Sequence, residues 1–76
     1  SFNRGNYDLA VSQYQKAAKL HPENPLGYYG LGYCYLIQGL IEEAIEALQQ
    51  AIHLKPNHME AQALLDRALA IKSTQQ

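Results

Sequence analysis

The sequence PLGYYGLGYCYLIQGLI, from Pro25 to Ile41, determines how the rest of the chain can be organised. It contains none of the chain's six Lys and Arg or seven Asp and Glu residues, yet it holds the single cysteine, Cys34. As a helix from Pro25 to about Gln38, it is apolar on two opposite sides rather than one. One stripe contains Tyr28, Leu31, Gly32 and Tyr35, and the other contains Leu26, Tyr29, Tyr33, Leu36 and Ile37. Such a helix packs on both sides, or packs on one side and binds a partner on the other.

The residues before and after this stretch also show helical periodicity, and no β pattern occurs. We therefore predict an all-α chain of four helices and three short turns. The expected helix ends are marked by caps, prolines and a glycine. They are an N-cap at Asn6, a stop at His21-Pro22, a start at Asn24-Pro25, a C-terminal glycine at Gly39, a stop at Lys55-Pro56 and a capping box from Asn57 to Glu60.

A shift of 34 residues brings like residues onto each other. The identical pairs are Gly5 with Gly39, Ala10 with Ala44, Gln15 with Gln49, Ala17 with Ala51, Leu20 with Leu54 and Pro22 with Pro56. A fixed period of this length indicates stacked helix-turn-helix repeats, a solenoid, rather than a closed bundle.

The middle of the chain resembles the tetratricopeptide repeat, whose usual pattern is W-x2-L-G-x2-Y, then A-x3-F, A and P. The matching residues are Tyr28 at the Trp site, Leu31, Gly32, Tyr35, Gly39, Ala44, Leu48, Ala51 and Pro56. The resemblance divides the chain into half, one and half repeats. Residues 1–24 would be the second helix of a first repeat, 25–58 a complete repeat, and 59–76 the first or capping helix of a third. The last part departs from the pattern at Gln62 and Asp66.

The resemblance implies a non-catalytic module for protein–protein interaction, with one stripe in the repeat core and the other on a concave groove. The implied core residues are Ala10, Tyr14, Ala17, Tyr28, Leu31, Gly32, Tyr35, Ala44, Leu48, Ala51 and Pro56. The implied groove residues are Leu26, Tyr29, Tyr33, Leu36, Ile37 and Arg67. Some family members hold a terminal carboxylate with Lys and Asn, but here only Arg67 is suitable. An apolar or aromatic-rich peptide or protein is therefore the expected ligand.

Two other functions fit the same pattern. Half-repeats at both ends could complete each other between two copies, giving a homodimer or a larger assembly in which the groove stripe is an interface. A small helical chaperone for a secreted protein is the third hypothesis, which the fold permits and no residue specifies.

Other classes of function find little support in the composition. The six basic residues are scattered, so we expect no nucleic-acid partner. The uncharged stretch is diluted by glycines and Gln38, so we expect no membrane insertion. The three histidines lack metal-ligand spacing, so neither a metal nor a cofactor is expected. Cys34 has no disulfide partner within the chain and is expected to be a small buried packing residue. No signal peptide is evident, which favours a cytoplasmic location while leaving the compartment open.

Overall fold

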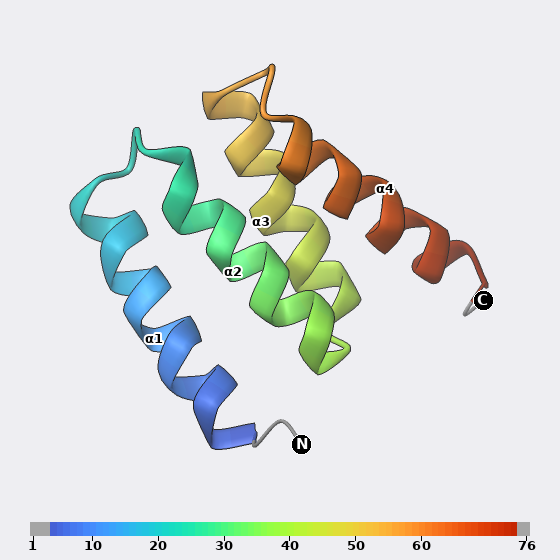
Figure 1. The fold of residues 1–76 in the computed structure, drawn as a ribbon, viewed down its shortest axis with the longest axis horizontal. Coiled ribbons are helices and arrows are strands. Elements are labelled where there is room, and N and C mark those ends of the chain that lie inside the picture. Colours follow the sequence, from blue (N-terminus) through green and yellow to red (C-terminus); the bar gives the residue numbers. More distant parts are fainter. Residues whose placement is uncertain (1–3, 75–76) are drawn as a thin grey trace.

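The computed structural model describes residues 4–74, with side chains from Tyr7 to Thr74, and these residues form four α-helices. Helix α1 spans Arg4–Leu20, α2 spans Pro25–Gln38, α3 spans Ile41–Leu54 and α4 spans Met59–Thr74. Consecutive helices are antiparallel and joined by short turns (Figure 1). The all-α prediction is confirmed for the described part of the chain.

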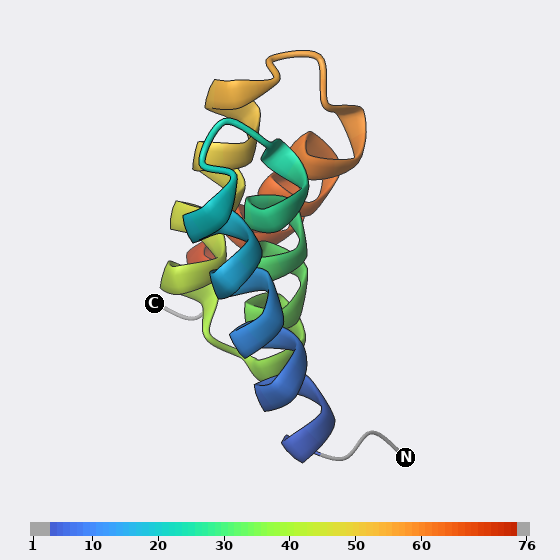
Figure 2. The same cartoon turned by 90° about the vertical axis from the view of Figure 1, so that its left-hand side faces the viewer.

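Helix α2 is the centre of the arrangement, because α1, α3 and α4 all pack against it. Helix α3 packs against both α2 and α4 and lies behind them in the view of Figure 1. Figure 2, turned by 90°, shows α1 lying against α2 along most of its length. The shortest principal dimension is 17 Å, against 34 Å for the longest. Both broad faces of this flat arrangement are therefore available to solvent or to a partner.

The predicted ends of α2 are confirmed in detail. The Asn24 side chain accepts a hydrogen bond from the Leu26 N–H at 3.0 Å, ahead of a proline in the first turn. Gly39 adopts φ 83°, which is the left-handed region that favours glycine. The Leu40 N–H donates to the Tyr35 carbonyl at 2.9 Å, and the Gly39 N–H donates to that of Leu36 at 3.1 Å. These two bonds form a Schellman motif, which satisfies carbonyls at the end of the helix.

Two other predicted caps are wrong. Helix α1 begins at Arg4, so Asn6 lies inside the helix and is not its N-cap. Helix α4 begins at Met59, which makes His58 rather than Asn57 the residue that precedes it. The His58 Nδ1 atom accepts a hydrogen bond from the Ala61 N–H at 3.4 Å. A ring nitrogen thus replaces the side-chain oxygen that the capping-box pattern requires.

The main core lies between α2, α3 and α4. Its centre is Leu48, whose side chain is fully buried. Alanines in α3 and α4 are also fully buried, so the helix backbones approach each other closely; they are Ala44, Ala51, Ala61 and Ala68. A smaller cluster of Ala18, Leu31 and Ala47 joins α1, α2 and α3. These two clusters fix the positions of the helices on either side of α2.

Three glycines of α2 sit where a neighbouring helix leaves little or no room for a side chain. The Leu48 side chain of α3 covers Gly32. The Tyr14 ring of α1 covers Gly30, and the α1 backbone at Ala18 lies about as close to Gly27 as a Cβ atom could tolerate. Glycine costs about 1 kcal/mol relative to alanine within a helix. In α2 this cost is offset by close packing on two sides.

The predicted repeat-core residues differ in burial. Leu31, Gly32, Ala44, Leu48 and Ala51 are buried, and Ala10, Ala17, Tyr28 and Tyr35 are half-buried. Tyr14 and Pro56, which were also predicted to belong to the repeat core, are exposed. Tyr14 remains 39% exposed because it lies across Gly30 at the surface of the α1–α2 contact. Pro56 lies in the turn after α3, where it stops the helix without being enclosed.

No helix within residues 4–74 combines the length and the apolar character needed to cross a membrane. The uncharged helix α2 instead makes protein contacts with its three neighbours.

Candidate functional site

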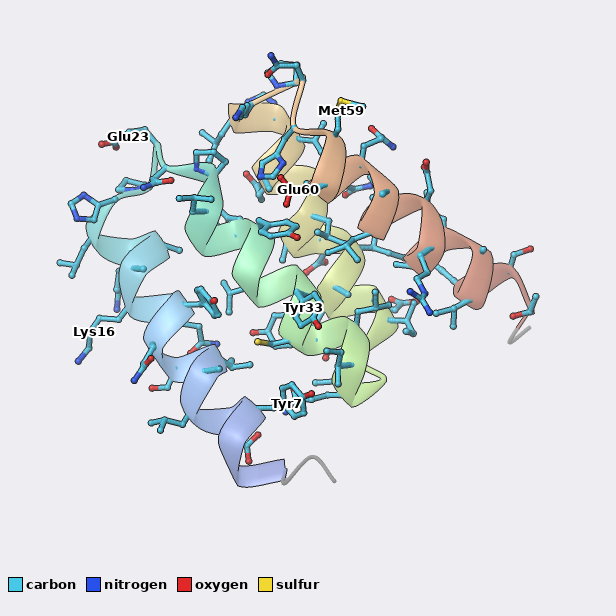
Figure 3. The ribbon with its side chains drawn as sticks, viewed as in Figure 1. Tyr7, Lys16, Glu23, Tyr33, Met59 and Glu60 are labelled. Carbon is cyan, nitrogen blue, oxygen red and sulfur yellow. The ribbon has the colours of Figure 1, made fainter. Side chains whose placement is uncertain are left out.

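A pocket of about 480 Å³ lies between α1 and α2 and is walled mainly by tyrosine. We call it the tyrosine pocket; its lining residues are Tyr7, Ala10, Tyr14, Tyr29, Gly30, Tyr33 and Cys34. Small residues form the remainder of the lining, so the rings bound an open space instead of filling it. Figure 3 shows Tyr7 and Tyr33 on the same broad face of the molecule. None of the described residues that line this pocket carries a full charge.

The local environment favours the neutral form of two tyrosine hydroxyls, those of Tyr7 and Tyr29. Burial, followed by the charges of Glu60, Tyr33 and Tyr14, raises the pKa of Tyr29. The pKa of Tyr7 is raised by burial and then by Tyr33 and Cys34. The hydroxyls therefore act as hydrogen-bond donors and acceptors over the physiological pH range.

Cys34 is 3% exposed and lies at the inner side of the tyrosine pocket. Burial raises the pKa of its thiol, so its reactive thiolate form is disfavoured. The expected role as a packing residue is confirmed by this burial. Within residues 4–74 no group of three or more His, Cys, Asp or Glu side chains could hold a metal ion.

His58 packs against Tyr29, a contact that was not predicted from the sequence. The two ring centroids are 5.0 Å apart with a tilt of 34°. His58 is itself buried and bonded to the start of α4 through the Ala61 N–H. One side chain thus joins the α4 N-terminus to a wall of the tyrosine pocket. The sequence does place His58 directly before an apolar helical pattern, at a position where an N-cap residue is expected.

A second pocket, of about 250 Å³, lies on the same face between α2 and α4. We call it the arginine pocket; it is lined by Tyr33, Leu36, Ile37, Leu64, Arg67 and Ile71. It is apolar except for the Arg67 guanidinium and the Tyr33 hydroxyl. Tyr33 belongs to both pockets, so the two adjoin across one ring. The two pockets therefore lie on either side of Tyr33, one toward α1 and the other toward α4, and we call the pair the depression across α2.

The structure brings five of the six predicted groove residues into these two pockets: Tyr29, Tyr33, Leu36, Ile37 and Arg67. Leu26 lines neither pocket and is 61% exposed near the start of α2. Tyr7 is not among the predicted groove residues, and Tyr14 is among the predicted repeat-core residues. Both rings lie in α1, and their contribution depends on how α1 crosses α2, which the helical period alone does not specify.

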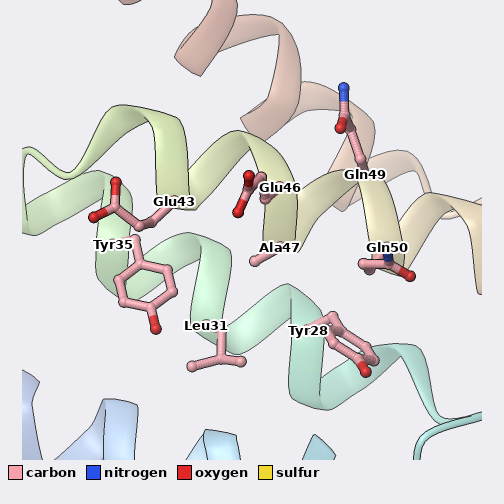
Figure 4. Close-up of a pocket in the computed structure, with 8 residues that line it drawn as sticks. All are labelled: Tyr28, Leu31, Tyr35, Glu43, Glu46, Ala47, Gln49 and Gln50. Carbon is pink, nitrogen blue, oxygen red and sulfur yellow. The ribbon is translucent and has the colours of Figure 1, made fainter.

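A further pocket, of about 440 Å³, lies along the other stripe of α2 and contains no part of the predicted groove. Tyr28, Leu31 and Tyr35 of α2 form one side of it, and Glu43, Glu46, Ala47, Gln49 and Gln50 of α3 form the other (Figure 4). The Tyr35 hydroxyl already accepts a hydrogen bond from Gln15 at 3.1 Å. The α2 side chains here belong to the packing between helices, and the polar α3 side chains extend into solvent. The tyrosine and arginine pockets are therefore the stronger candidate site.

The four stacked antiparallel helices define a helical-repeat protein. The sequence model of the tetratricopeptide repeat family matches residues 2–58, and the chain belongs to this family. Tetratricopeptide repeats are non-catalytic modules that mediate protein–protein interaction.

Curated relatives carry similar sequence within much longer chains. The anaphase-promoting complex subunit CDC16 of Saccharomyces cerevisiae is 31% identical over 67 residues, which are 88% of this chain and 8% of that protein. Anaphase-promoting complex subunit 6 of Dictyostelium discoideum is 30% identical over 69 residues, 91% of this chain and 8% of that protein. The mitochondrial import receptor subunit TOM70 of S. cerevisiae is 35% identical over 69 residues, 91% of this chain and 11% of that protein. The chain thus spans about a tenth of the length of these relatives.

Proposed function

We propose that the chain binds an extended peptide segment of a partner protein in the depression formed by the tyrosine and arginine pockets. The observation that carries this proposal is the exposure of large apolar side chains along that depression. Tyr33 is 47% exposed and Ile37 is 41% exposed, although both belong to the central helix of the fold. Tyrosine suits recognition because it offers a large contact area, few rotatable bonds and a hydroxyl group.

The shape of the site supports a peptide rather than a single small ligand. Two adjoining pockets of about 480 and 250 Å³ lie on either side of Tyr33. An extended chain places alternate side chains on the same side, so a short segment can fill both pockets. The apolar lining favours an apolar or aromatic side chain in at least one of them.

The experiment is a selection of displayed random peptides on the intact chain, followed by affinity measurements on the selected sequences. Tyr33→Ala should weaken binding at least tenfold and leave the helical circular dichroism signal and melting temperature nearly unchanged. The matched control is Leu20→Ala, because Leu20 is 68% exposed and lies outside both pockets. Equal affinity for Tyr33→Ala and the unsubstituted chain would refute the proposed site.

The same variants separate the competing hypotheses. If light scattering shows a dimer that Tyr33→Ala converts to a monomer, this face is an interface between copies of the chain. If Tyr33→Ala unfolds the chain, Tyr33 is a packing residue. A folded monomer that loses peptide affinity on this change supports the recognition surface.

A further inference from the structure

The caps of α2 and α4 occupy the same position of the 34-residue repeat but differ in their chemistry. Asn24 caps α2, because its side-chain oxygen accepts a hydrogen bond from the Leu26 N–H. His58 stands 34 residues later and caps α4, because its Nδ1 atom accepts a hydrogen bond from the Ala61 N–H. The amide of asparagine does not titrate, whereas histidine exchanges a proton between about pH 5 and 8. Mild acid can therefore change the cap of α4 but not that of α2.

The hydrogen bond and the burial of His58 both require a neutral ring. Because Nδ1 accepts the Ala61 N–H, the proton of the neutral imidazole lies on Nε2. A second proton would occupy Nδ1, where it would face another donor. It would also place a positive charge at the N-terminal end of α4, where the helix dipole disfavours cations. His58 is only 6% exposed, so this charge would lose most of its hydration as well.

Other charged or titratable groups surround His58 on three helices. They are Tyr29 of α2, His53 and Lys55 at the end of α3, and Glu60 and Asp66 of α4. The two carboxylates and the Tyr29 ring favour an imidazolium, whereas the two basic groups oppose it. All four ionisable side chains of α3 and α4 are exposed, so water screens their effects. The lost acceptor and the burial are therefore the larger contributions.

We propose that protonation of His58 uncaps α4 and releases the imidazole ring from Tyr29, so that mild acid loosens the start of α4. The released ring moves into water, where the exposed Glu60 carboxylate can pair with it. Glu60 lies at the start of α4, on the broad face that also carries Tyr33 (Figure 3). This switch requires no bound ligand, so it is independent of the proposed function.

The first measurement follows the α4 cap by nuclear magnetic resonance on the intact, nitrogen-15-labelled chain between about pH 7.5 and pH 5. At the upper pH, the ring nitrogens of His58 should show a bare Nδ1 and a protonated Nε2. As the pH falls, the Ala61 amide should shift and lose protection from hydrogen exchange, after correction for the intrinsic exchange rate. The Leu26 amide is the internal control and should keep its shift and its protection, because Asn24 does not titrate. An Ala61 amide as constant as that of Leu26 would overturn the proposal.

The second measurement compares urea unfolding of three chains at the two ends of this pH range. His58→Asn supplies a cap that does not titrate, so at about pH 5 this variant should be more stable than the unsubstituted chain. Relative to His58→Asn, the unfolding equilibrium constant of the unsubstituted chain should rise about 2- to 30-fold as the pH falls, which corresponds to the loss of one N-cap. His53→Gln is the matched control, because His53 is exposed and its charge favours the end of α3. This variant should keep the full acid-induced loss.

Two outcomes of the unfolding comparison would contradict the switch. One is an equal response of His58→Asn and the unsubstituted chain to the change of pH. The other is a chain that His58 stabilises further in acid, which would mean that the imidazolium stays in place against Tyr29 and Glu60. The resonance measurement needs no variant, so it tests the proposal even if His58→Asn does not fold.

Discussion

The contact between Gly32 and Leu48 allows a quantitative test of how α2 and α3 pack. A Cβ atom at position 32 would overlap the Leu48 side chain, whose Cδ2 atom lies 2.6 Å from it. Leu48 is fully buried and cannot swing into solvent. The Gly32→Ala change therefore combines two opposing terms. It gains about 1 kcal/mol of helix propensity and loses about 1–3 kcal/mol through overpacking. The net effect should lie between neutral and about 2 kcal/mol destabilising.

The Leu48→Ala change should reverse the sign of this effect. Alone it should cost about 2–5 kcal/mol, because it removes a buried side chain and leaves a cavity. In that background the new methyl group at position 32 enters vacated space and keeps its propensity gain of about 1 kcal/mol. The double variant should therefore be more stable than Leu48→Ala alone. The two changes should be coupled by about 1–3 kcal/mol, within the range measured for contacting residues.

The assay is urea unfolding of the four proteins of the cycle, followed by circular dichroism. A domain of this size has about 4–11 kcal/mol of total stability, so an osmolyte in the buffer keeps the weakest variant folded. Gly30→Ala with Leu48→Ala is the matched control, because Tyr14 rather than Leu48 covers Gly30. These two changes should be additive within about 0.5 kcal/mol. Additive free energies for the Gly32 and Leu48 pair would refute the close contact.

Two further predictions concern the link between α4 and the tyrosine pocket. His58→Ala should lower the free energy of unfolding, measured in urea, by about 0.5–2 kcal/mol, because the Ala61 N–H loses its acceptor. His58→Asn supplies another acceptor and should recover most of the lost free energy. The raised pKa of Tyr29, caused first by burial and then by Glu60, means that the folded chain binds this proton more tightly than the unfolded chain. The stabilisation that the protonated Tyr29 hydroxyl contributes should therefore be fully present below about pH 10 and should decline as the pH rises further. Tyr29→Phe should remove this part of the decline in the free energy of unfolding. An identical decline in the variant would contradict the prediction.

The helices and their order follow from local features of the sequence. Pro25 and Asn24 start α2, Gly39 ends it in a left-handed conformation, and the structure reproduces both ends. The repeat of 34 residues adds long-range information, because it predicts stacking without any contact being known. Local chemistry was insufficient at Asn6 and Asn57. Several residues near a helix terminus can serve as a cap, and at the start of α4 the capping side chain is His58, whose ring also packs against Tyr29 of α2.

The sequence by itself determined that α2 carries two apolar stripes, and which residues each stripe contains. This follows from the fixed angle between successive residues of a helix. Only the tertiary structure decided which residues of α1 face the exposed stripe, because the crossing of two helices depends on the side chains at their contact. Gly27 and Gly30 let α1 approach α2 closely, and this approach brings Tyr7 and Tyr14 to the pocket. The candidate site therefore combines residues of α2, whose shared face follows from the helical period, with residues of α1, whose positions depend on how the two helices pack.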